Sequence, residues 1–214
     1  YRDRGYWVHS VKVGGDVDQN IERIQDVETH RPTKERILYD ANRGFTRQQA
    51  LRVMQATDQW KVMFEQPCET LDDIAAIRPL HSAPVSVDEC LVTLQDATRV
   101  ARDGIAEVFG IKLNRVGGLT KASRIRDIAL AHGIDIFVMA TGGSVLADTE
   151  ALHLAATIPD DNMLGVWACQ DMITAEIADG AGPRATKGHL HLPEQPGLGV
   201  HPQESTLTKV ARYE

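Results

Sequence analysis

The chain has 214 residues, of which 43% are hydrophobic and 25% are charged. This content is enough for one sizeable hydrophobic core and too apolar for a disordered protein. The 23 basic and 30 acidic residues give a formal net charge of -7. This is the wrong sign for binding a phosphate backbone, so we expect no nucleic-acid partner.

The sequence also argues against a membrane or secreted protein. No apolar run approaches the roughly 20 residues of a membrane span, and the first ten residues, YRDRGYWVHS, lack the apolar stretch of a signal peptide. The three cysteines, Cys68, Cys90 and Cys169, have no CxxC spacing, which suits a reducing compartment. We therefore expect a soluble, cytoplasmic protein that does not bind membranes.

Segments typical of strands and helices alternate along most of the chain. Short apolar runs rich in β-branched and aromatic residues predict strands over residues 7–12, 36–40, 60–65, 83–88, 108–113, 134–140 and 164–168. Amphipathic stretches between them predict helices, among them 46–57 and 118–133. Apolar strands that alternate with helices are typical of an α/β fold with a covered parallel sheet, either a barrel or a doubly wound sheet.

Five successive predicted strands end in a polar residue: Lys12, Asp40, Glu65, Asp88 and Lys112. They are 28, 25, 23 and 24 residues apart. Each spacing is about the length of one strand–helix unit, so the five side chains would occupy equivalent points of consecutive strands. In a parallel barrel those points converge at the C-terminal face, where such folds have their active sites.

The three carboxylates among these residues are candidate metal ligands. Carboxylates that meet at one place repel one another unless a cation binds them. An all-oxygen ligand set with open positions suits Mg²⁺, which commonly keeps water or substrate oxygens in its shell. Lys12 and Lys112 beside that cation would have a lowered pKa, which a lysine needs to act as a base near neutral pH.

Each of these residues also has an ordinary structural interpretation. A lysine at a strand end is most often a surface residue, and each carboxylate could cap the helix that follows its strand. Glu is a poor helix cap, and the regular spacing would then be a coincidence, so we favour the catalytic and metal-ligand interpretations. Asn42 and Glu89 are expected to support the ligands, with loop hydrogen bonding as the alternative.

The motifs around the five residues resemble the enolase superfamily, in its muconate-lactonizing and mandelate-racemase branches. These motifs are VKVGGD, YDANRGF, FEQPCE, VDECL and IKLNRVGGLTKA, and the resemblance spans about residues 5–200. It implies a modified TIM barrel of the (β/α)7β type, preceded by a capping domain. It also implies that Asp40, Glu65 and Asp88 bind Mg²⁺ while Lys12 and Lys112 face each other across the substrate.

The resemblance further implies that the predicted strands are the second to the eighth of the barrel, so that the chain lacks the capping domain and the first strand. The strand–helix pattern fades after Asp171. We expect a barrel portion over residues 1–171 and a tail over residues 172–214 that packs on the barrel or the capping domain. Many relatives have a K-x-K motif where this chain has Ser10, Val11 and Lys12. In the family the base corresponds to the second lysine, so the resemblance implies that Lys12 retains this role.

The step that the superfamily shares is abstraction of the proton α to a carboxylate. Two opposed lysines permit racemisation or epimerisation, or dehydration if the second lysine protonates a leaving β-hydroxyl. The segments VMATGGSVLADTEALHLAATIP and LGVWACQD are most similar to the cis-3-hydroxy-L-proline dehydratases, which form Δ1-pyrroline-2-carboxylate. Thr141, Gly142, Gly143 and Trp167 would then contact the substrate, with structural packing as the alternative.

Other functions remain open at this stage. One is epimerisation, by a proline-betaine 2-epimerase or a dipeptide epimerase. Another is a non-catalytic family member with a structural or binding role, although retention of all five polar positions argues against it. We expect a small-molecule carboxylate as the substrate and a homo-oligomer as the assembly.

Overall fold

The structure is a computed structural model of the chain. It describes residues 1–169, 172–174, 177–179, 182–208 and 210–211.

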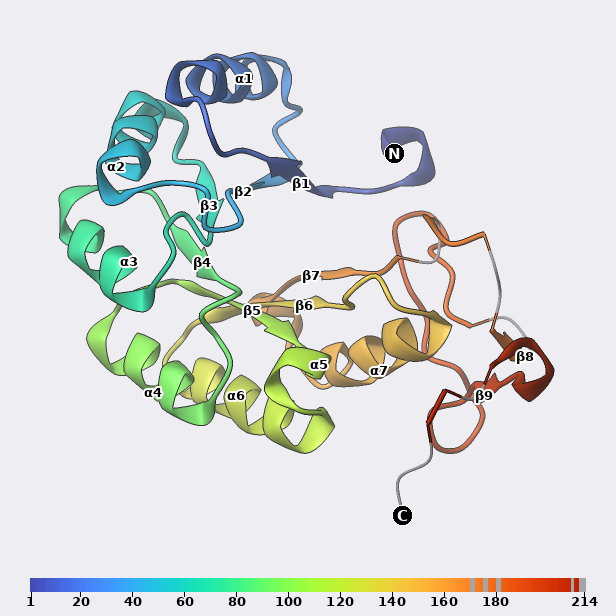
Figure 1. The fold of residues 1–214 in the computed structure, drawn as a ribbon. Coiled ribbons are helices and arrows are strands. Elements are labelled where there is room, and N and C mark those ends of the chain that lie inside the picture. Colours follow the sequence, from blue (N-terminus) through green and yellow to red (C-terminus); the bar gives the residue numbers. More distant parts are fainter. Residues whose placement is uncertain (170–171, 175–176, 180–181, 209, 212–214) are drawn as a thin grey trace.

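The described strands β1 to β7 form one sheet in their order along the chain, and each neighbouring pair is parallel. The edge strands β1 and β7 lie close together. A Cβ atom added to Gly165 of β7 would lie 3.7 Å from Cγ2 of Val8 in β1. The sheet is therefore nearly closed into a barrel (Figure 1). Its strands are β1 (Val8–Lys12), β2 (Arg36–Asp40), β3 (Met63–Glu65), β4 (Val85–Val87), β5 (Val108–Lys112), β6 (Asp135–Met139) and β7 (Met163–Trp167).

Helices connect the strands and surround the outer face of the curved sheet (Figure 1). They are α1 (Val17–His30), α2 (Arg47–Ala56), α3 (Leu71–Ile77), α4 (Leu94–Asp103), the single turn α5 (Leu113–Val116), α6 (Leu119–Ala131) and α7 (Val145–Ala155). Short 3-10 turns lie at Arg2–Arg4, Asp58–Trp60, Arg78–Leu80, Asp160–Asn162 and Glu204–Thr206. The alternation of strand and helix confirms the predicted α/β barrel.

The hydrophobic core has two parts because alternate strand residues point to opposite faces of the sheet. One part lies between the sheet and the helices and contains strand residues such as Ile111 and helix residues such as Ile24 and Ile125. The other part contains Val108, Phe137 and Met139. Val108 lies on the same face of β5 as Lys112, four residues further on, so this smaller cluster lies below the C-terminal ends of the strands.

The third and fourth strands are shorter than the sequence predicts. Residues 60–62 do not belong to β3, because Trp60 ends a 3-10 turn and Lys61 adopts a φ of 51°. The fourth strand begins at Val85, directly after Pro84, which has no N–H to donate to a neighbouring strand.

The described part of the tail contains β8 (Ala178–Asp179) and β9 (His201–Pro202), which pair antiparallel. Val200 packs against Val145 of α7, so the tail contacts that helix. The boundary expected after Asp171 lies outside the described residues, and the division into barrel portion and tail stays a prediction. In the part of the chain that the structure describes, every helix is too short or too polar to cross a lipid bilayer.

Candidate functional site

The five polar residues predicted from the sequence lie at the carboxyl ends of the first five strands. Lys12, Asp40, Glu65 and Lys112 are the last residues of β1, β2, β3 and β5. Asp88 directly follows β4. The register pairs Lys12 with Asp40 and Asp40 with Glu65. The parallel sheet thus places all five residues at its C-terminal end.

The three carboxylates do not act as helix caps. The helices that follow β2, β3 and β4 begin after threonines, and each threonine hydroxyl accepts a hydrogen bond from a backbone N–H of its helix. These caps are Thr46, Thr70 and Thr93. The helix-cap interpretation of the carboxylates is therefore wrong.

Asp40 belongs to a chain of polar contacts on the β1 side of the site. Lys12 Nζ forms an ion pair with Asp40 and donates to Asn42 Oδ1 at 2.6 Å. The backbone N–H of Asn42 donates to the other oxygen of Asp40 at 2.9 Å, and Asn42 Nδ2 donates to Glu89 at 3.0 Å. Asn42 therefore contacts both Lys12 and Asp40, as a supporting residue would. The Lys12 side chain is 67% exposed.

Asp88 lies on the β5 side and is fully buried. Lys112 Nζ donates to Asp88 Oδ2 at 2.7 Å, and Arg115 forms an ion pair with Asp88 Oδ1. The Lys112 side chain is only 16% exposed. Arg115 is not among the residues predicted from the sequence, although it lies within the IKLNRVGG motif and follows Lys112 by three residues. This spacing places both side chains on the same side of a helical turn.

Glu65 lies between the two aspartates and differs from them because none of the described residues forms a hydrogen bond with its buried Oε1. Burial raises the pKa of Glu65 to about 8, and the negative charges of Asp40 and Asp88 add to this effect. Lys112 and Lys12 act in the opposite direction. Without a bound cation, Glu65 is therefore mainly a neutral acid at pH 7. A buried, unpaired carboxyl with a shifted pKa is typical of a functional site.

Gln66, which was also not predicted from the sequence, holds the loop that carries Asp88. Its buried Oε1 accepts hydrogen bonds from the backbone N–H groups of Asp88 at 3.0 Å and Cys90 at 3.2 Å. Its Nε2 donates to the carbonyl oxygen of Cys68 at 3.0 Å. The backbone of Gln66 has a φ of 38°, which departs from strand geometry. The strand pattern of the sequence could not reveal these contacts.

The residues expected to contact the substrate lie on β7 and just beyond β6. Trp167 is the last residue of β7 and packs against the cluster of Val108, Phe137 and Met139. Thr141 is exposed, and its hydroxyl donates to Asn114 Oδ1 of α5 at 2.5 Å. Gly142 and Gly143 follow Thr141 and are exposed too. Their contact with a substrate stays a prediction.

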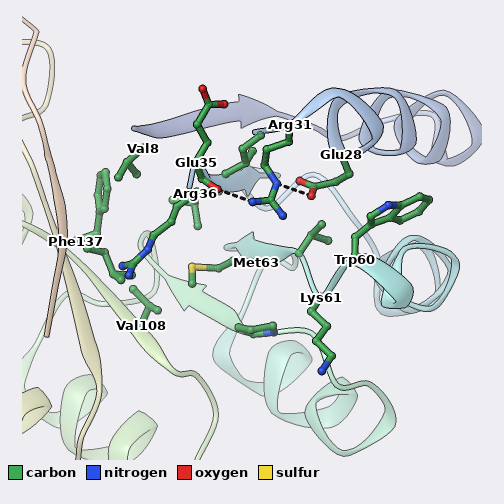
Figure 2. Close-up of a pocket in the computed structure, with 15 residues that line it drawn as sticks. Val8, Glu28, Arg31, Glu35, Arg36, Trp60, Lys61, Met63, Val108 and Phe137 are labelled. Carbon is green, nitrogen blue, oxygen red and sulfur yellow. Dashed lines mark hydrogen bonds and ion pairs between the residues drawn. The ribbon is translucent and has the colours of Figure 1, made fainter. Parts of the chain in front are cut away.

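A cavity of about 190 Å³ lies at the opposite end of the sheet (Figure 2). Its lining includes Val8, Arg36, Met63 and Val108, which are the first residues of β1, β2, β3 and β5. Figure 2 shows Arg31 bonded to Glu28 and to the backbone of Glu35 beside this cavity. None of the five polar residues lines it, so we assign it no part in the chemistry.

The family of the chain follows from a comparison with known proteins. A model of the family described as Enolase C-terminal domain-like matches residues 1–206. The chain belongs to the enolase superfamily. This confirms the resemblance that the five motifs carry.

The enolase-superfamily chain has curated relatives with several activities. It is 33% identical over 214 residues to cis-3-hydroxy-L-proline dehydratase of Roseibium aggregatum, with 100% of this chain and 58% of the dehydratase covered. The chain thus spans less than two thirds of the length of that relative. Further relatives at 26–31% identity are o-succinylbenzoate synthases, an N-succinylamino acid racemase and epimerases.

Solved structures of the superfamily share the same fold. A protein of Silicibacter pomeroyi assigned to the mandelate racemase/muconate lactonizing enzymes has a TM-score of 0.95 and 75% identity, over 99% of this chain and 58% of that chain. A superfamily member from Roseovarius nubinhibens ISM, crystallised in complex with magnesium, has a TM-score of 0.94 and 38% identity, over 100% of this chain and 58% of that chain.

The residues at the site fit the requirements of a magnesium ion. Among the described residues, no three His, Cys, Asp or Glu side chains already have the geometry of a metal centre, because Asp40 and Asp88 face their lysines. Three carboxylates nevertheless supply the hard oxygen donors that Mg²⁺ prefers, and the Oε1 of Glu65 is buried without a partner.

Proposed function

We propose that the protein containing this chain is a Mg²⁺-dependent lyase that removes the α-proton of a small amino acid carboxylate and eliminates water. The proposed reaction converts cis-3-hydroxy-L-proline to Δ1-pyrroline-2-carboxylate. The observation that carries this proposal is the placement of three carboxylates on β2, β3 and β4 between lysines on β1 and β5. The 33% identity to a dehydratase of that specificity supports the choice of substrate.

Asp40, Glu65 and Asp88 would hold the Mg²⁺ ion. The neighbour from Roseovarius nubinhibens that was crystallised with magnesium supports this assignment, as does the unpaired buried oxygen of Glu65. When bound, Mg²⁺ would hold the substrate carboxylate and stabilise the negative charge that develops as the α-proton leaves. Asn42 and Glu89 would orient Asp40 and Lys12 through their hydrogen bonds.

Lys12 and Lys112 would perform the proton transfers. Strands β2, β3 and β4 lie between them in the sheet, so the two amines would approach a substrate from different sides. One lysine, as the neutral amine, takes the α-proton, and the other, as the ammonium, gives a proton to the leaving β-hydroxyl. Water leaves, and the resulting enamine tautomerises to Δ1-pyrroline-2-carboxylate.

The stereochemistry of the substrate requires this opposed arrangement. In the cis isomer the hydroxyl and the carboxylate lie on one face of the ring, so the α-hydrogen and the hydroxyl lie on opposite faces. The base and the acid must therefore act from opposite faces. Trp167 would form an apolar wall beside the ring, and Thr141, Gly142 and Gly143 would supply a hydroxyl and backbone donors at the mouth of the site.

The test is to incubate the full-length protein and Mg²⁺ with each isomer of 3-hydroxyproline and to measure pyrroline-carboxylate. We expect product from the cis-L isomer and none when EDTA replaces Mg²⁺. A protein in which Lys112 is replaced by Met serves as the control for chemistry that does not depend on the site. Absence of product from the cis-L isomer would overturn the dehydratase proposal.

Epimerisation is the second candidate, because opposed lysines also suit removal and return of a proton on opposite faces. The epimerases among the relatives support it. Deuterium incorporation from solvent at Cα of a betaine or a dipeptide, without loss of water, would favour this reaction. A non-catalytic member would show neither reaction. The homo-oligomeric assembly and the cytoplasmic location stay predictions.

A further inference from the structure

Asp88 is paired with two cationic side chains, one at each carboxylate oxygen. Its Oδ2 accepts a hydrogen bond from Lys112 at 2.7 Å, and its Oδ1 is paired with Arg115. Among the described residues, Asp40 is paired with one cation, Lys12. Lys12 and Lys112 have roles in the proposed reaction, whereas Arg115 has none.

The turn α5 directs Arg115 back toward Asp88. It begins directly after β5, with Lys112 as its N-cap residue. Asn114 accepts a hydrogen bond from Thr141, which follows β6, at 2.5 Å. Arg115 reaches instead to Asp88 beyond β4. Neighbouring residues of one turn thus contact residues that follow the two strands beside β5, and this orientation holds the guanidinium on the candidate ligand.

Three cationic side chains already neutralise the carboxylates of the site before a metal ion is added. Asp40, Glu65 and Asp88 carry at most three negative charges, and Lys12, Lys112 and Arg115 carry three positive charges. A divalent cation added to this set would leave an excess of positive charge in surroundings where charges interact strongly. Movement of Arg115 away from Asp88 reduces this excess and keeps both lysines in place.

Arg115 is suited to such a movement. A fully buried carboxylate without a counter-ion is strongly destabilising, and both Lys112 and Arg115 supply that counter-charge to Asp88. A guanidinium remains charged at every physiological pH and cannot be neutralised in place when Mg²⁺ binds. The Arg115 side chain is 22% exposed, so its long chain has a path to solvent.

We propose that Arg115 occupies Asp88 in the metal-free protein and leaves it when Mg²⁺ binds, thereby lowering the affinity of the site for the ion. This inference rests on the proposed Mg²⁺ site. It makes Arg115 a competitor of the metal ion, in contrast to a residue that orients Asp88 in the metal-bound state.

The experiment measures the dissociation constant of Mg²⁺ by calorimetry for the full-length wild-type protein and for Arg115→Gln. We expect the constant to fall roughly tenfold in the variant, because one repelling charge is removed. In EDTA we expect a lower melting temperature for Arg115→Gln than for the wild type, and in saturating Mg²⁺ we expect this difference to close. Arg99→Gln is the matched control, because Arg99 pairs with the exposed Asp72 on the outer surface.

Arg115→Lys keeps a positive charge on a shorter side chain and tests the proposal if Arg115→Gln does not fold. We expect its dissociation constant to lie between those of the wild type and of Arg115→Gln. Unchanged or weaker Mg²⁺ binding in the variants, with normal binding by the wild type, would overturn this inference and leave the proposed function intact. A wild-type protein that binds no Mg²⁺ would overturn both.

Discussion

Both ends of the sheet contain buried carboxylates, but the partners of these carboxylates differ between the two ends. At the N-terminal end, Glu28 accepts hydrogen bonds from Arg31 at 2.7 Å and from the Tyr39 hydroxyl at 2.8 Å. Glu35 accepts two bonds from Arg2, which hold the pKa of that carboxyl below its ordinary value. Each of these carboxylates is matched by an arginine of the chain.

At the C-terminal end, Glu65 has a buried oxygen for which the described part of the chain supplies no hydrogen-bond partner, and burial raises the pKa of Glu65 to about 8. A buried polar group without a partner destabilises a fold, and such groups persist mainly where function requires them. The comparison therefore separates Glu28 and Glu35, which are matched by arginines, from Glu65, which is unmatched among the described residues and whose partner we propose to be Mg²⁺.

The largest expected effect is the loss of activity when either lysine is replaced. Lys12→Met and Lys112→Met should each lower turnover by about 10³-fold, because a general acid or base contributes roughly 10² to 10⁴. Lys34→Met is the control, since Lys34 is exposed at the other end of the sheet. Steady-state kinetics with Mg²⁺ measures the effect. Substantial activity in either variant would show that its lysine is misassigned.

The next effect concerns the metal ion. Mg²⁺ at 100 times its dissociation constant should stabilise the wild-type protein by about 2.7 kcal/mol, since it binds only the folded state. Glu65→Gln should lose this gain, because a neutral amide is a poor substitute for a carboxylate ligand. Urea unfolding in EDTA and in Mg²⁺ measures both. Equal stabilisation of the variant and the wild type would remove Glu65 from the ligand set.

A comparison of Glu28→Gln with Glu65→Gln, both in EDTA, tests the difference between the carboxylates at the two ends of the sheet. Glu28→Gln should lower the free energy of unfolding by about 1–3 kcal/mol, because it removes the charge that Arg31 and Tyr39 contact. Glu65→Gln should change it by less, because the amide resembles the neutral acid present without metal. An equal loss in the two variants would contradict the distinction between matched and unmatched carboxylates.

The smallest expected effect is that of Tyr39→Phe. It removes one buried hydrogen bond to Glu28 and leaves the contact with Arg31, so it should lower the free energy of unfolding by about 1 kcal/mol. Its affinity for Mg²⁺ should equal that of the wild type. Tyr1→Phe is the control, because Tyr1 is 74% exposed. A change in Mg²⁺ affinity would indicate coupling between the two ends of the sheet.

Much of the fold could be predicted from the sequence because each strand of the sheet corresponds to a short apolar run. Apolar runs at regular intervals predicted all seven strands of the sheet, and the spacing of Lys12, Asp40, Glu65, Asp88 and Lys112 predicted their common position at the strand ends. The errors at Trp60 and Lys61 arose where a 3-10 turn with a positive φ interrupts an apolar run. Side-chain type alone does not reveal that turn.

The sequence by itself determined the family, the order of the strands and the five polar strand ends, since these depend on residue type and on distance along the chain. Only the tertiary structure decided how those side chains are paired. The contact of Arg115 with Asp88 joins residues 27 positions apart, and that of Gln66 with Asp88 joins residues 22 apart. Such contacts depend on the curvature of the sheet and the orientation of α5, which are set by packing across the whole barrel.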